Sequence, residues 1–350
     1  MIIRSKAPLR IGLAGGGSDV APFSKIYGGC VLNTTINLYS YCTIIPKSDG
    51  KIKFFASDIK QTFSFNVGEK LNIDKTLPLL KGVYNYMLDF AKEIPSCEIY
   101  THSDATNGSG LGGSSSMVIA IMKAFCEFLN FPMEEYQMAK LAVEIERSYL
   151  GFSGGKQDQY AAVFGGINFI EFNTDGSIIV NPLKIKKNVI EELQSRILLY
   201  FTGISRDSAS IINEQISNTK NKNLDAIEAT KVVKEDAIKM KKALLLGDLD
   251  EIATILGHSW EHKKKMASAI SNPTITEAFD VAIKNGAISG KVSGAGGGGF
   301  ITFFVLPEKK YTVAEKLREL GGKVEMPSFV DEGAISWRYD NDRNDKITNF

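Results

Sequence analysis

The sequence has little cysteine and no long hydrophobic run, and both shortages exclude classes of protein. Four cysteines stand far apart and form no C-x-x-C pair: Cys30, Cys42, Cys97 and Cys126. We therefore expect reduced thiols, not the disulfide framework of small secreted domains. No run approaches the roughly 20 apolar residues of a membrane span, and no apolar signal segment follows the N-terminus. These absences predict a cytoplasmic protein.

An excess of charge of either sign is also lacking. The 41 basic and 40 acidic residues leave a formal net charge of +1. Nucleic acids and acidic membrane surfaces are polyanions that favour strongly basic partners. The balance therefore predicts that neither is the main partner. Nothing in the composition indicates an oligomeric state.

Several common catalytic motifs are missing. No G-K-[ST] occurs, which excludes a Walker A loop, and the H-R-D and D-F-G signatures of protein kinases are absent as well. His258-Ser259-Trp260-Glu261-His262 matches H-x-x-E-H, a zinc motif. However, a run of lysines follows it on a predicted helix, and His102 is the only other histidine. A solvated helix face is the expected reading.

The length favours two lobes, because single cores stop growing near ~250–300 residues and this chain has 350. Apolar alternation predicts strands in both halves, and 3.6-residue spacing predicts helices between them. The pattern changes at a polar stretch near residue 190. We expect an α+β fold with domains of residues 1–190 and 191–350. The longest predicted helices cover residues 79–93, 114–129, 133–150, 223–246 and 249–269.

The strongest motif is a loop rich in glycine and serine, Asn107-Gly108-Ser109-Gly110-Leu111-Gly112-Gly113-Ser114-Ser115-Ser116, which opens a buried helix. Glycines let a ligand approach the backbone, and a helix N-terminus offers unpaired N–H groups to an anion. A triphosphate is the expected ligand. The loop also matches G-x-G-x-x-G, but a second helix follows where a dinucleotide-binding unit needs a strand.

Two further glycine clusters flank this loop in the sequence. Gly15-Gly16-Gly17-Ser18-Asp19 forms a tight turn with side chains that suit a polyol, although a simple Ser/Asp turn or helix cap is the alternative. Lys291 to Phe300 contains Gly294, Gly296, Gly297, Gly298 and Gly299 at the start of a predicted strand. Glycine weakens a strand, so some group is expected to approach this backbone closely.

Together the three clusters, in this order and spacing, resemble the GHMP kinases. The resemblance spans nearly the whole chain and extends to GGKQDQYAAVFGG, FTGISRDSA and KVSGAGGGGF, which are similar to the heptose kinase branch. It implies an N-lobe like domain 2 of ribosomal protein S5, a ferredoxin-like C-lobe and a cleft between them. It also implies ATP and Mg²⁺ as cofactors.

The resemblance assigns roles to individual residues. Asp158 matches the catalytic aspartate that accepts the proton of the hydroxyl, and Arg10 matches the basic residue that stabilises the developing oxyanion. Ser114 and Glu146 are the implied metal ligands, with Glu144 as a competitor of Glu146. The implied ATP-binding residues are Gly108, Ser109, Gly110, Leu111, Gly112, Gly113, Ser114 and Ser115. Phe54-Phe55 is either core or the wall of an adenine pocket.

The resemblance also implies a substrate: D-glycero-D-manno-heptose 7-phosphate, phosphorylated on its anomeric hydroxyl in the synthesis of GDP-heptose for surface polysaccharide. The expected substrate-binding residues are Gly17, Ser18, Asp19, Lys156, Arg206, Gly296 and Gly297, with Lys291 as a further candidate for the substrate phosphate. Glycine at positions 16 and 17 leaves room for a bulky sugar. The alternatives are a kinase for a free sugar such as fucose, or a non-catalytic binding protein.

Overall fold

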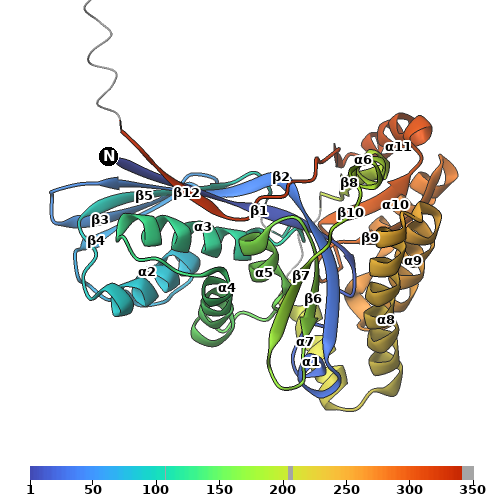
Figure 1. The fold of residues 1–350 in the computed structure, drawn as a ribbon, viewed down its shortest axis with the longest axis horizontal. Helices are drawn as coiled ribbons and strands as arrows, with labels where there is room; N and C mark the ends of the chain where they lie inside the picture. The colour runs from blue at the N-terminus through green and yellow to red at the C-terminus, as the bar shows by residue number, and fades with distance from the viewer. Residues whose placement is uncertain (107, 204–207, 341–350) are drawn as a thin grey trace, which may run out of the picture.

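The structure, a computed structural model, describes residues 1–106, 108–203 and 208–340. Two sheets organise it, one of eight strands and one of four (Figure 1). The larger sheet contains β1 Ile2–Ala14, β2 Gly29–Pro46, β3 Lys51–Ala56, β4 Gln61–Asn66, β5 Cys97–Ser103, β6 Ile167–Phe172, β7 Ile178–Pro182 and β12 Ile335–Tyr339. The smaller sheet contains β8 Ile197–Phe201, β9 Ala287–Val292, β10 Phe300–Val305 and β11 Lys323–Glu325.

Helices cover these sheets and fill the space between them (Figure 1). In the N-lobe they are α1 Phe23–Tyr27, α2 Pro78–Ala91, α3 Gly113–Phe128, α4 Glu135–Val143, the π-helix η1 Glu144–Tyr149 and α5 Gln157–Phe164. In the C-lobe they are α6 Lys187–Arg196, α7 Ser208–Lys220, α8 Leu224–Leu246, α9 Leu249–Lys263, the 3₁₀ turn η2 Ser268–Ile270, α10 Pro273–Lys284 and α11 Pro307–Glu319. Among the described residues, no helix is both long and apolar enough to cross a membrane. The four cysteines are buried and free.

Strand β2 shows how the larger sheet is assembled. Its 18 residues are rich in valine, isoleucine, threonine and tyrosine, which suit a pleated surface. The first third, Gly29–Thr34, pairs with β6, and the last part, Ser40–Pro46, pairs with β5. Strand β1 runs antiparallel along β2, and β12 covers the other edge of β1, with Ile2 opposite Tyr339. A strand from the end of the chain therefore completes the N-lobe sheet.

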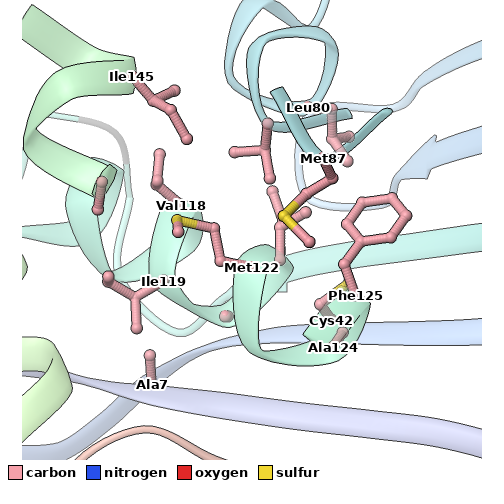
Figure 2. Close-up of a cluster of buried hydrophobic side chains, with 14 of the residues drawn as sticks. Ala7, Cys42, Leu80, Met87, Val118, Ile119, Met122, Ala124, Phe125 and Ile145 are labelled. Atoms are coloured by element: carbon pink, nitrogen blue, oxygen red, sulfur yellow. The ribbon is translucent and has the colours of Figure 1, made fainter. Parts of the chain in front are cut away.

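Helix α3 is apolar nearly all round because it lies between the sheet and other helices. Figure 2 shows Ile119 on the side of Ala7 in β1, whereas Met122 and Phe125 lie on the side of Met87 in α2. The sequence correctly predicts this helix as buried, and it correctly predicts the hairpin of β3 and β4. The N-terminus of α3 is thereby fixed against the core, where the loop rich in glycine and serine ends.

The lobes share a second hydrophobic core. Side chains of β1 pack against helices α8 and α9 of the C-lobe, for example Leu9 and Ile11 with Met240 and Leu244. Local signals define these two helices: Asn223 caps α8, and Asp248 accepts a hydrogen bond from the Glu251 amide (3.0 Å) at the start of α9. The boundary near residue 190 stays a prediction, and helix α6 lies in that polar stretch.

We predict that Phe125→Ala destabilises the N-lobe strongly. Phe125 belongs to α3 and is fully buried on the side that faces α2, and large-to-small changes of this kind typically cost about 3–5 kcal/mol. Urea unfolding followed by circular dichroism measures the change. Phe90→Ala is the matched control, because Phe90 is 41% exposed. Equal losses in both variants would contradict the assignment of this core.

Candidate active site

A cavity of about 840 Å³ lies between the two lobes. The N-lobe contributes the end of β1, the loop before α3, the π-helix η1 and the N-terminus of α5. The C-lobe contributes α7, the end of α9 and the loop after β9. Segments from the whole chain therefore meet here, including parts of all three glycine clusters.

The loop before α3 forms one wall. Gly108, Ser109, Gly110 and Gly112 to Ser115 line the cavity, and α3 begins at Gly113 without a side-chain cap. The first N–H groups of a helix have no partner within it, so these amides are available to an anion. Leu111 does not line the cavity: its side chain is buried in the core that the lobes share. The Leu111 side chain therefore packs in this core, and a role of Leu111 in ATP binding stays a prediction.

Arg10 and Asp158 form a close ion pair in the cavity. The Nη2 and Nε atoms of Arg10 lie 2.6 and 2.8 Å from Oδ1 of Asp158. Nη1 donates to the carbonyl oxygen of Gly110 at 2.7 Å, which ties the pair to the glycine loop. Arg10 is buried and Asp158 retains a partly exposed carboxylate. A basic group and a carboxylate that can accept a proton therefore stand together beside the anion site.

Asp19 is buried and lines the cavity. Its carboxylate accepts hydrogen bonds from the backbone amides of Lys156 at 2.8 Å and Gln157 at 3.1 Å. It thereby caps α5, the helix that carries Asp158. Ser18 behaves differently: its hydroxyl bonds to the carbonyl oxygens of Gly15 and Cys30, and it does not line the cavity. The structure brings Asp19 to the site but turns the Ser18 hydroxyl into the turn.

Glu146 lines the cavity from a stretch where the helix widens. The predicted helix over 133–150 ends at Val143 and continues as the π-helix η1, and such wide turns often occur at functional sites. Glu146 is 1% exposed, whereas Glu144 is exposed to solvent. Its carboxylate accepts hydrogen bonds from the hydroxyls of Ser114 (3.1 Å) and Ser115 (2.7 Å).

This carboxylate also accepts a hydrogen bond from Nε2 of Gln159, and the nearest basic group, Arg147, stays 3.9 Å away. A buried carboxylate with hydroxyl neighbours suits a hard cation that takes oxygen ligands. The described residues contain no group of three or more His, Cys, Asp or Glu that could hold a metal alone. A cation here would need further oxygens, for example from a phosphate.

The glycine cluster at Gly294–Gly299 packs against the loop before α3. A Cβ atom at Gly294 would lie 2.8 Å from Cα of Gly110, and one at Gly110 would lie 2.7 Å from the Ser293 carbonyl oxygen. The group that approaches this backbone is therefore the other glycine loop. Gly296 and Gly297 do not line the cavity; they pack on Ile270, whose carbonyl oxygen accepts the Gly297 amide. Their contact with substrate stays a prediction.

Of the predicted basic residues, Arg206 lies outside the described part of the chain. Lys156 is partly buried, which lowers its pKa, and its side chain does not line the cavity. Lys291 is buried and its Nζ donates to the carbonyl oxygen of Gly12 at 2.9 Å, away from the cavity. Burial lowers the pKa of Lys291 well below its ordinary value. The cavity is instead lined by Lys263 at the end of α9.

Apolar side chains of the N-lobe line another part of the cavity: Ala56, Ile59, Leu77, Leu80 and Met117. Asp58, Gln61 and Lys75 line the cavity from the same segments. The alternatives left open for Phe54-Phe55 are resolved: Phe54 is core, Phe55 stacks on Tyr100, and neither lines the cavity.

The histidines of the zinc-like motif have partners within the protein. Nδ1 of His258 lies 3.0 Å from the carboxylate of the buried Asp236, and Nδ1 of His262 lies 3.0 Å from the backbone oxygen of His258.

We expect Gly155→Ala to disturb the polar end of the cavity. A Cβ atom at Gly155 would lie 1.9 Å from Oδ2 of Asp19, so the carboxylate must leave the α5 amides. The Michaelis constant for the acceptor should rise about tenfold or more while that for the nucleotide changes little, because a loosened Asp19 affects one end only. Initial-rate kinetics measure both constants. Gly176→Ala, in an open turn, is the control, and equal Michaelis constants in all proteins would refute the prediction.

Sequence reasoning missed Lys263, Arg147 and Gln159 as members of the site. Lys263 could have been found, because it continues the buried stripe of α9 through Leu256 and Trp260 at helical spacing. Gln159 follows Asp158 directly but faces Glu146, which depends on the π-helix and has no sequence signal we recognise.

Comparisons with known proteins match this geometry. Residues 66–166 match the GHMP kinases N terminal domain, and residues 240–323 match the GHMP kinases C terminal domain. D-glycero-alpha-D-manno-heptose 7-phosphate kinase of Campylobacter jejuni is 48% identical over 96% of this chain and 99% of that protein. A bifunctional fucokinase/GDP-fucose pyrophosphorylase of Arabidopsis thaliana is 26% identical over 94% of this chain and 32% of that protein.

A solved structure shows the same architecture. The D-glycero-D-manno-heptose 1-phosphate kinase from Bacteroides thetaiotaomicron superposes with a TM-score of 0.83 at 47% identity, covering 97% of this chain and 100% of that one. The names of these relatives place the phosphate of the sugar at different positions, 7 and 1.

Proposed function

This chain belongs to the GHMP kinase family, whose members transfer a phosphoryl group from ATP to an alcohol, and from that premise we propose that its acceptor is the anomeric hydroxyl of D-glycero-D-manno-heptose 7-phosphate. The observation that carries the proposal is the continuous cavity that joins the α3 N-terminus to Asp158 and Asp19. A nucleotide and a sugar phosphate fit such a cavity end to end. The product would be the heptose 1,7-bisphosphate.

In this arrangement, the part of the cavity with apolar side chains holds the base and the α3 amides bind the phosphates. The reacting hydroxyl lies beside Asp158, which accepts its proton, and Arg10 neutralises charge on the phosphoryl group. Asp19 accepts hydrogen bonds from sugar hydroxyls with the lone pairs that the α5 amides leave free. Because Arg10 bonds to both Asp158 and the Gly110 carbonyl, it keeps acceptor and phosphates in register.

Mg²⁺ is part of the proposal. Glu146 and Ser114 would hold it next to the α3 N-terminus, with phosphate oxygens and waters as its remaining ligands. The ion would neutralise phosphate charge in the bound nucleotide. Ser115 and Gln159 orient the Glu146 carboxylate through their hydrogen bonds to Oε2.

A coupled ADP-release assay with ATP and Mg²⁺ tests the proposal. It compares heptose 7-phosphate, heptose 1-phosphate, free heptose, fucose and mannose. Turnover of the 7-phosphate alone is the expected result. Turnover of the 1-phosphate would exclude the anomeric oxygen as acceptor, because that oxygen is already esterified. Turnover of fucose would assign the chain to a free sugar, and no turnover of any sugar would favour a binding protein.

A further inference from the structure

Lys263 is a buried basic residue of the cavity to which neither the sequence analysis nor the proposed function assigns a role. It is the last residue of α9, is 3% exposed and lines the cavity. Its neighbours in sequence, Lys264 and Lys265, point to solvent to a greater degree, and Lys264 pairs with Glu261. The three lysines therefore differ in environment although they form one run in the sequence.

The contacts of Lys263 leave most of its ammonium group unused. Its Nζ donates to the Gly294 carbonyl oxygen, and the described residues supply no other hydrogen-bond acceptor for the three N–H donors of the group. Burying a charge without a partner is costly, and buried lysines are usually paired. A lysine in this position is therefore prepared for an anion that the cavity admits.

Charged groups surround the ammonium from four elements. Arg10 of β1 and Lys291 of β9 repel it, while Asp19 in the turn after β1 and Asp158 of α5 attract it. Burial, followed by the repulsion of Arg10, lowers the pKa of Lys263 to about 8. The same groups that surround the reacting hydroxyl in the proposed function thus act on Lys263.

We propose that Lys263 is a further catalytic residue, supplied by the C-lobe, whose ammonium contacts the phosphoryl group in transit. The inference rests on the proposed kinase function. In the transfer, the acceptor oxygen bonds to the γ-phosphorus, the bond from that phosphorus to the bridging oxygen breaks, and ADP leaves with the bonding electrons. The hydroxyl proton passes to Asp158, and Lys263 and Arg10 stabilise the charge on the phosphoryl oxygens.

The position of Gly294 favours this assignment over a role in binding the substrate phosphate. Gly294 touches Gly110 of the phosphate-binding loop, and the carbonyl oxygen of Gly110 accepts from Arg10. Lys263 is therefore joined through these backbone groups to the pair of Arg10 and Asp158. A phosphate on carbon 7 is separated from the anomeric hydroxyl by the ring oxygen and the exocyclic carbons, so it does not share the position of the phosphoryl group in transit.

Kinetics of Lys263→Met, Lys263→Arg and the surface control Lys265→Met test the proposal, using whichever sugar the wild type phosphorylates. Because the charged form is required, kcat/KM of the wild type should fall as pH rises through about 8. Lys263→Met should lose about 10- to 100-fold in kcat, the size of a charged hydrogen bond, while Lys265→Met is unchanged. Lys263→Arg should retain part of the wild-type kcat, and its decrease in kcat/KM at alkaline pH should shift to a higher pH.

A second measurement does not depend on the fold of a variant. Acetic anhydride modifies neutral amines, and mass spectrometry gives the rate at Lys263 and at Lys265 in the wild type. ATP with Mg²⁺ should protect Lys263 and leave Lys265 unaffected. An unprotected Lys263, an alkaline decrease in Lys263→Arg at the same pH as in the wild type, or a loss confined to the KM of phosphorylated sugars would each overturn the proposal. Absence of sugar turnover by the wild type would instead refute the proposed function, and the protection experiment would still report on Lys263.

Discussion

Asp158→Asn should reduce kcat by about 10²–10⁴, because the variant keeps the shape of the side chain and loses the base. The amide can still accept a hydrogen bond from Arg10, so the N-terminus of α5 should keep its place. We therefore expect the dissociation constant of ATP and the thermal midpoint to change little. Stopped assays over long times and calorimetric titration with an ATP analogue measure the two effects separately.

The partner of this pair supplies a test of its logic. Arg10→Met should also have a low kcat. The kcat of the double variant should fall by much less than the product of the two single fold-losses, because the effects of residues that act as a unit are not additive. Asp158→Asn with more than a tenth of the wild-type kcat would remove Asp158 from the role of base. Additive losses would mean that Arg10 and Asp158 act independently.

Glu146→Gln should produce the second large effect, through the metal. The substitution preserves volume and removes the charge that the proposed Mg²⁺ needs. The Mg²⁺ concentration for half-maximal rate should rise roughly 10- to 100-fold, the range seen when the surroundings of a metal are altered. At fixed low Mg²⁺, kcat/KM should fall by about 10²–10³, as for loss of a charge-stabilising group.

Glu144 provides the matched control for this experiment. It lies two residues before Glu146 in the same π-helix and is exposed. Glu144→Gln should leave the Mg²⁺ titration unchanged. If Glu146→Gln titrates like the wild type, the metal is held elsewhere, and the short contacts of Glu146 with Ser114 and Ser115 serve only to fix the loop.

Much of this architecture could be predicted from the sequence because its signals are local. Helix α3 is apolar on nearly all sides, and apolar and polar residues alternate along the strands of the β3–β4 hairpin. The loop between Gly108 and Ser115 could also be predicted, since glycine freedom and a helix start are properties of a short segment. The loop proposed to bind the phosphates could therefore be predicted without knowledge of the C-lobe.

What could not be predicted depends on contacts between distant segments. Ser18 and Asp19 are adjacent and both polar. Only the fold shows that the Ser18 hydroxyl bonds to the Cys30 carbonyl oxygen, whereas the Asp19 carboxylate accepts a backbone amide at the start of α5. The sequence predicts that some group approaches the backbone of the Gly294–Gly299 cluster closely. The packing of the two lobes makes Gly110 that neighbour.

Helical spacing separates the three lysines at 263–265. This run follows the zinc-like motif, which the sequence predicts to lie on a solvated helix face. Lys263 nevertheless falls on the stripe of Ile252, Leu256 and Trp260, which faces the core. The position on the helix, not the residue type, decides burial here.

The pairing of β12 with β1 affects how the chain matures on the ribosome. Residues 2–6 emerge well before their partners, residues 335–339. At about 5–20 residues per second, this edge waits on the order of tens of seconds for its partner. During that time an unpaired strand edge is open to pairing with another nascent chain. Translation speed and chaperone access should thus influence the yield of this protein.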